Sequence, residues 1–98
     1  MLADHITGII TYHRMYVDWT DGIHTAILLT EIERRTKNKG DWVTLTRTEL
    51  WEITGLTYCQ QQTARSTLIR LGFTLERKKG IPPVLQFQLT ESFWMNTK

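Results

Sequence analysis

Residues 46–72 constrain the fold of this chain more than any other stretch, because they have the pattern of two short helices joined by a tight turn. Thr46 and Glu49 have the spacing of a capping box, in which the threonine hydroxyl and the glutamate carboxylate each accept from a backbone amide at the helix start. Thr57 and Gln60 repeat this spacing just after a glycine, the residue that most often ends a helix. The pattern predicts a helix-turn-helix.

The second helix of the pair is predicted to start at Tyr58 and to end at Gly72, with about 14 residues and a length of about 21 Å. At 100° per residue, Ala64, Leu68 and Leu71 lie on one side, which we expect to face the core. The opposite side is polar, and recognition helices present mainly their amino-terminal part to bases. Glutamine and arginine hydrogen-bond base edges, and tyrosine and serine reach phosphates. The residues predicted to contact DNA on this helix are Tyr58, Gln62, Arg65 and Ser66. The alternative is a solvated polar face that binds nothing.

After Gly72 the spacing of apolar residues changes to the alternation that is typical of strands. Two alternating segments, 73–77 and 84–89, are joined by the basic, proline-containing segment 78–83. A helix-turn-helix followed by such a hairpin is the winged-helix arrangement. The cations predicted to contact DNA phosphates, on the wing and on the helix before the turn, are Arg77, Lys78, Lys79 and Arg47. An ordinary soluble turn is the alternative for the two lysines.

The other segments complete a single α+β domain with a three-helix core and a C-terminal β-hairpin wing. A helix that is apolar around most of its first half is predicted within residues 23–37, and a short third strand within 42–45. The tail contains Phe93, Trp94 and Met95, which either close the core or form an exposed anchor for a partner. The predicted parts are an amino-terminal arm of undecided structure at 1–19, the helix-turn-helix at 46–72, the wing at 73–89 and the tail at 90–98.

Charge is distributed unevenly along the chain. Residues 1–33 contain one cation and five acids, a net charge of −4, whereas the chain from Arg34 onward contains eleven cations and five acids, a net charge of +6. The basic part includes the helix-turn-helix, which points to a polyanion as partner. Arg34 and Arg35 also have a structural explanation, because cations stabilise the last turn of a helix.

Catalytic and metal sites find little support in the sequence. His5, His13 and His24 lack a ligand-like spacing, and the single cysteine, Cys59, has no neighbouring histidine to act as a base. No apolar run approaches the roughly 18 residues of a membrane span, and the first residues lack a basic signal-peptide region. We therefore expect no enzymatic activity, no metal, no cofactor and no membrane association, in a cytoplasmic protein.

Four segments in order resemble the winged helix-turn-helix domain of phage and plasmid replication proteins. They are HTAILLTEI, GDWVTLTRTELWEITGL, QQTARSTLIRLGF and GIPPVLQFQL, and the resemblance covers about residues 12–89. The chain differs from that family at Glu33-Arg34-Arg35, where an aromatic residue is usual, and at Phe87, where tyrosine is common. The resemblance implies a small phage or plasmid DNA-binding protein that acts in replication or transcription control.

Two functions from different classes follow. In the first, the chain reads double-stranded DNA with helix 58–71 and the wing, as a homodimer because one short helix reads few base pairs. In the second, a phage-encoded protein uses the same scaffold to bind and inhibit a host protein, such as a defence complex, in the host cytoplasm. Its support is the small size, the acidic first third and the aromatic tail.

Overall fold

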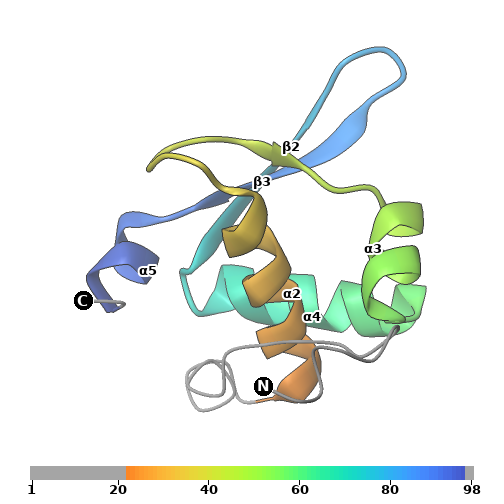
Figure 1. The fold of residues 1–98 in the computed structure, drawn as a ribbon, viewed down its shortest axis with the longest axis horizontal. Coiled ribbons are helices and arrows are strands. Elements are labelled where there is room, and N and C mark those ends of the chain that lie inside the picture. The colour runs from red at the N-terminus through yellow and green to blue at the C-terminus, as the bar shows by residue number, and fades with distance from the viewer. Residues whose placement is uncertain (1–21, 97–98) are drawn as a thin grey trace.

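A computed structural model describes residues 22–96 of the protein (Figure 1), so the predicted amino-terminal arm at 1–19 lies outside the described residues. Within this range, three helices precede a hairpin of two antiparallel strands, and a fourth helix follows it. The elements are α2 (Ile23–Arg35), β1 (Val43–Thr44), α3 (Arg47–Thr54), α4 (Tyr58–Arg70), β2 (Thr74–Lys79), β3 (Val84–Leu89) and α5 (Glu91–Asn96). This order confirms the predicted α+β fold and its winged-helix-like arrangement.

Both predicted capping boxes are formed. At the start of α3, the Glu49 amide donates to the Thr46 hydroxyl at 3.0 Å, and the Thr46 amide donates to the Glu49 carboxylate at 3.1 Å. At the start of α4, the Gln60 amide donates to the Thr57 hydroxyl at 3.2 Å, and the Thr57 amide donates to the Gln60 side chain at 2.9 Å. Gly55 ends α3 with φ 75°, the left-handed conformation that glycine adopts without strain. The short turn between the helices is therefore specified locally.

The sheet has the strand order β1-β3-β2, with both pairs antiparallel. Phe87 at the centre of β3 lies opposite Val43 on one side and Glu76 on the other. Since side chains alternate between the two faces of a strand, these residues share the face that packs on the helices. Arg77 and Gln86 share the outer face. This division decides which wing residues lie on the same side as α4.

Strand β2 is longer than the sequence predicts. Lys78 and Lys79 lie in the strand, opposite Leu85 and Val84, and the connection is only 80–83. The prediction that the loop starts at Lys78 is wrong because two consecutive lysines break the apolar alternation without breaking the hydrogen-bonded ladder. Lysines are well tolerated there, since β2 is an edge strand.

The core lies between α2, α4 and the inner face of the sheet. Leu28 on α2, Leu68 on α4 and Phe87 on β3 are fully buried, as expected for the predicted central helix and inward face. On α3, the three-residue step from Leu50 to Ile53 predicts that both residues pack inward; Leu50 is buried, but Ile53 is 41% exposed, so the prediction is wrong for Ile53. The other buried residue of α3 is Thr54, four residues after Leu50.

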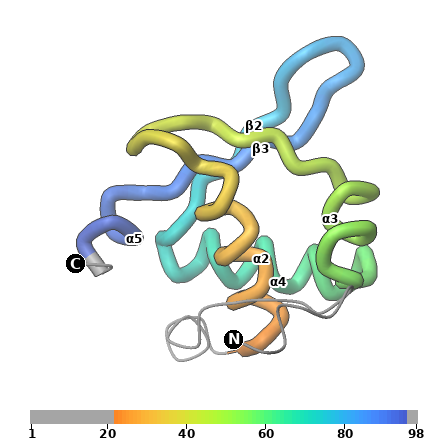
Figure 2. Tube along the Cα trace, viewed as in Figure 1, coloured from red at the N-terminus to blue at the C-terminus, as the bar shows by residue number. Residues whose placement is uncertain are grey.

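The carboxyl-terminal tail forms helix α5 at the end of the sheet away from the wing tip, as Figure 2 shows. The Trp94 amide donates to the carbonyl of Thr90 at 3.2 Å, which starts the helix. Phe93 is fully buried and Met95 is 66% exposed. The first alternative for the tail is thus confirmed for Phe93, which closes the core. No helix within residues 22–96 is long and apolar enough to cross a membrane.

Candidate nucleic-acid interface

The first half of α4 presents a polar surface to solvent. Tyr58 is 50% exposed, and Gln62 and Ser66 are also exposed, whereas Ala64 and Leu68 on the other side of the helix are fully buried. The three exposed residues recur every four positions and therefore form one stripe along the helix. The stripe contains hydroxyl and amide groups that both donate and accept, as base and phosphate recognition requires.

Arg47 joins this surface from the neighbouring helix. The carbon at the centre of its guanidinium lies 4.9 Å from the centroid of the Tyr58 ring, within the range of a cation–π contact. Both residues are the first of their helices, and both are exposed. The stack places a cation over the tyrosine ring, at one end of the polar stripe.

Gln61 holds the two helices of this unit in place, a role that the sequence did not reveal. Its side-chain nitrogen donates to the Arg47 carbonyl at 3.1 Å and to the Leu56 carbonyl at 3.0 Å, and the residue is fully buried. At 100° per residue, Gln61 lies at the edge of the side formed by Ala64, Leu68 and Leu71, so the helical period alone does not predict that it is buried. The hydrogen bonds connect α4 to the start of α3 and to the turn, so they fix the position of Arg47 next to α4.

Replacing Gln61 with alanine is expected to lower the free energy of unfolding by about 2 kcal/mol, because two buried carbonyls lose their donor. Gln62→Ala is the matched control, since Gln62 is the next residue and is exposed; its effect should stay within about 0.5 kcal/mol. Urea denaturation of the two variants provides the comparison. Equal stabilities would show that the Gln61 hydrogen bonds do not hold the turn.

Arg65, which the sequence predicts to contact DNA, is bound to the wing. Its guanidinium donates to both carboxylate oxygens of Glu76 on β2, at 3.0 and 2.9 Å, and the two side chains are only 18% and 13% exposed. A bidentate pair of this kind fixes orientation as well as distance. Arg65 therefore anchors the wing to α4, and its guanidinium is not presented to a ligand in this conformation.

The wing cations divide between the two faces of the sheet. Lys78 is exposed and shares the helix-facing side of β2 with Glu76, so it lies on the same side as α4. Lys79 is exposed at the end of the strand, on the opposite side. Both lysines lie next to the connection 80–83, where long side chains reach beyond the hairpin in either direction.

Arg77 lies on the outer face of the sheet, away from α4. The centre of its guanidinium is 4.2 Å from the centroid of the Trp42 ring, and its Nε donates to Gln86 at 2.7 Å. The Gln86 amide in turn donates to Thr44 at 3.0 Å, so the three strands are linked across this face. The sequence grouped Arg77 with the lysines of the wing, but the alternation of β2 directs it to a different surface.

The cations at the end of α2 have a partner within the helix. Arg34 and Arg35 both donate to the carboxylate of Glu31, each at 3.0 Å, and this carboxylate is almost fully buried. The structure therefore supports the structural explanation for these two arginines over a phosphate contact. The two guanidinium groups share this one carboxylate, and the Arg34 side chain remains 61% exposed.

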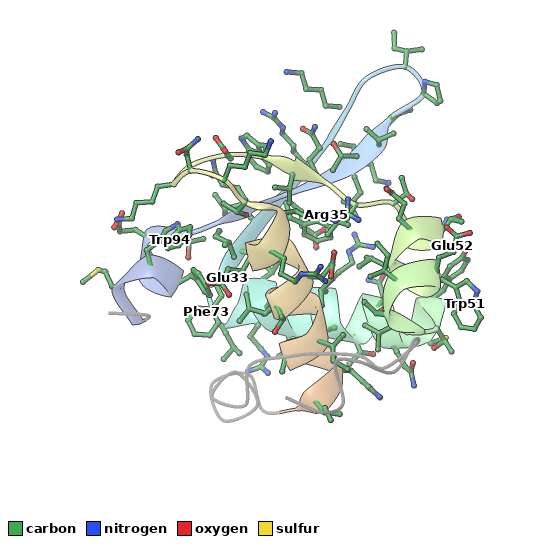
Figure 3. The ribbon with its side chains drawn as sticks, viewed as in Figure 1. Glu33, Arg35, Trp51, Glu52, Phe73 and Trp94 are labelled. Atoms are coloured by element: carbon green, nitrogen blue, oxygen red, sulfur yellow. The ribbon has the colours of Figure 1, made fainter. Side chains whose placement is uncertain are left out.

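Helix α3 directs Trp51 and Glu52 outward, away from the core (Figure 3). Trp51 is 50% exposed. Arg35 points instead toward the centre of the molecule, between α2 and α3 (Figure 3), where its guanidinium also lies 3.8 Å from the carboxylate of Glu49. Helix α3 thus presents Trp51 and Glu52 to solvent near the turn that joins it to α4.

Comparisons with protein-family models, with curated proteins and with solved structures found no match. Within residues 22–96, no group of three or more histidine, cysteine, aspartate or glutamate side chains is placed to hold a metal ion. The surface formed by Tyr58, Gln62, Ser66, Arg47 and Lys78, with Lys79 at its border, is the candidate interface. We call it the α4–wing surface.

Proposed function

We propose that the protein binds double-stranded DNA through the α4–wing surface and acts as a regulator of transcription or replication. One observation carries the proposal: the exposed polar stripe of α4 lies beside a wing that Arg65 and Glu76 hold against the same helix. An α-helix fits the major groove of B-DNA, where amide side chains read base edges. Gln62 on the stripe has the chemistry to read adenine.

The cations of the surface suit the DNA backbone. Arg47, Lys78 and Lys79 are all exposed, and no acidic residue lies between Arg77 and the end of β3. Phosphate contacts fix the position of a protein on the duplex and supply most of its non-specific affinity. Three such contacts predict that log K falls with log salt at a slope of about −2.7.

Removing the two wing lysines tests the proposal. For the variant with Lys78→Ala and Lys79→Ala, we expect weaker binding and a salt slope of about −0.9, because two phosphate contacts are lost. The measurement is fluorescence anisotropy of a labelled duplex over a series of salt concentrations. Lys37→Ala with Lys39→Ala is the matched control, since it removes the same charge from the loop after α2. Absence of wild-type binding at low salt, or an equal loss in the control, would refute the proposal.

A homodimer fits this function, because one 13-residue recognition helix contacts few base pairs. Two copies related by a two-fold axis would read half-sites about 34 Å apart. The alternative function, inhibition of a host protein, loses part of its support because Phe93 of the aromatic tail is buried in the core. Met95 of the same tail remains 66% exposed and still supports it, and the half-exposed Trp51 on α3 adds apolar surface.

A further inference from the structure

The tip of the wing is apolar and stands fully in solvent. Ile81, Pro82 and Pro83 are all exposed, and Ile81 is 102% exposed, which leaves its whole side chain free of contacts. Gly80 turns the chain with φ 99° just before them. A single exposed isoleucine is common on protein surfaces, but here three consecutive apolar residues form the outermost point of a hairpin.

The surroundings of this tip are cationic. Lys78 and Lys79 precede it on β2, and the nearest acid along the strand, Glu76, is neutralised by Arg65. On the returning strand, Val84 and Leu85 lie opposite the two lysines and add no charge. The two lysines are consecutive residues of β2 and lie on opposite faces of the hairpin. An apolar tip with a cation on each face behind it is complementary to a ligand that offers phosphates on both sides and an apolar interior.

The DNA minor groove has this combination. Its walls carry the phosphates, and its floor opens onto stacked bases between which isoleucine and proline side chains insert in several architectural proteins. The inserted side chain unstacks one base step, and the duplex bends away from it. The minor groove is only about 6 Å wide, so the side chain at the point of the hairpin would enter it while the two strands stay outside.

We propose that the wing tip inserts Ile81 between two base pairs from the minor groove and kinks the bound duplex. Pro82 and Pro83 limit the freedom of the connection beside it, and Lys78 and Lys79 contact the phosphates on either side. The proposal rests on the DNA binding proposed above, to which it adds the groove read by the wing and the shape of the bound DNA. The protein would then bind most tightly to DNA sites with a flexible pyrimidine–purine step under the tip, since these steps cost least to unstack.

Resonance energy transfer between dyes at the two ends of a short duplex measures the bend. We expect wild-type protein to bend the duplex by about 20 to 90°, and Ile81→Ser to abolish the bend while the protein still binds. Ile81→Leu should restore it, because leucine keeps an apolar side chain of the same size. Leu75→Ser is the matched control: Leu75 is also an exposed apolar residue of the wing, at 51%, but lies at its base.

The outcomes separate this proposal from the proposed function. Absence of DNA binding by the wild-type protein would refute both. Binding without a bend, or a bend that Ile81→Ser leaves unchanged, would refute the inserted tip and leave the proposed function intact. Loss of the bend in Leu75→Ser as well as in Ile81→Ser would also refute it, because the effect would then belong to the whole wing. Thermal unfolding of each variant confirms that it is folded, which we expect because both side chains are exposed.

Discussion

Phe87→Ala is expected to lower the free energy of unfolding by about 3 to 5 kcal/mol, the range for removing a buried aromatic side chain. Phe87 is fully buried at the centre of the middle strand. Its backbone neighbours are Val43 on β1 and Glu76 on β2, so the cavity would open where all three strands meet the helices. Domains of this size have a total stability of about 5 to 15 kcal/mol, so the variant would lose a large part of the free energy that keeps it folded.

Leu75→Ala is the control for this prediction. Leu75 is a large apolar residue of the same sheet, but it lies on the outer face and is 51% exposed. Its replacement should change the free energy of unfolding by less than about 1 kcal/mol, since half of the side chain is already in water. Urea denaturation of both variants measures the difference. Similar losses for Phe87→Ala and Leu75→Ala would contradict the assignment of the two faces.

The features that the sequence predicted correctly depend on residues close together in the chain. The capping boxes need only Thr46 with Glu49 and Thr57 with Gln60, each pair three residues apart, and all four hydrogen bonds are formed. The inward position of Leu68 likewise follows from the helical period. Such local patterns were enough to predict the order of the elements from α2 to β3 and the winged-helix-like arrangement.

The features that the sequence did not predict depend on distant contacts. Arg65 is eleven residues from Glu76, and only the packing of the wing against α4 brings the two charges together. Gln61 is fourteen residues from Arg47, whose carbonyl it binds. A helical wheel separates polar from apolar positions, but it does not tell a polar residue that binds a distant carbonyl from one that faces water.

Helix α5 shows the same limit in a short element. Six residues do not form a stable helix alone, because nucleation is costly. The helix forms here because Phe93 is buried in the core and Thr90 accepts from the amide of Phe93 at 3.4 Å. Thr90 followed by Glu91 was a usable signal of a helix start, but it becomes convincing only once the position of Phe93 is known.

The pair of Arg65 and Glu76 gives the second large prediction. Arg65→Met is expected to lower the free energy of unfolding by about 2 to 4 kcal/mol, because it leaves the carboxylate of Glu76 mostly buried and without its cation. Arg65→Met combined with Glu76→Leu should recover most of this loss, since apolar pairs often replace buried ion pairs without cost. A double-mutant cycle from urea denaturation measures the coupling. Additive effects would contradict the role of the pair as an anchor of the wing.

Glu76→Gln separates the structural role of Arg65 from a role in DNA binding. The change removes the charge that holds the guanidinium, so we expect a less stable protein in which Arg65 is released toward the α4–wing surface. If that surface binds DNA, the released cation adds a phosphate contact, and the salt slope becomes steeper by about 0.9. Stability would then fall while DNA affinity rises, whereas a wing that only loses its anchor would lower both. Anisotropy and urea denaturation on the same variant distinguish the two results, and the sign of the affinity change decides whether Glu76 competes with DNA for Arg65.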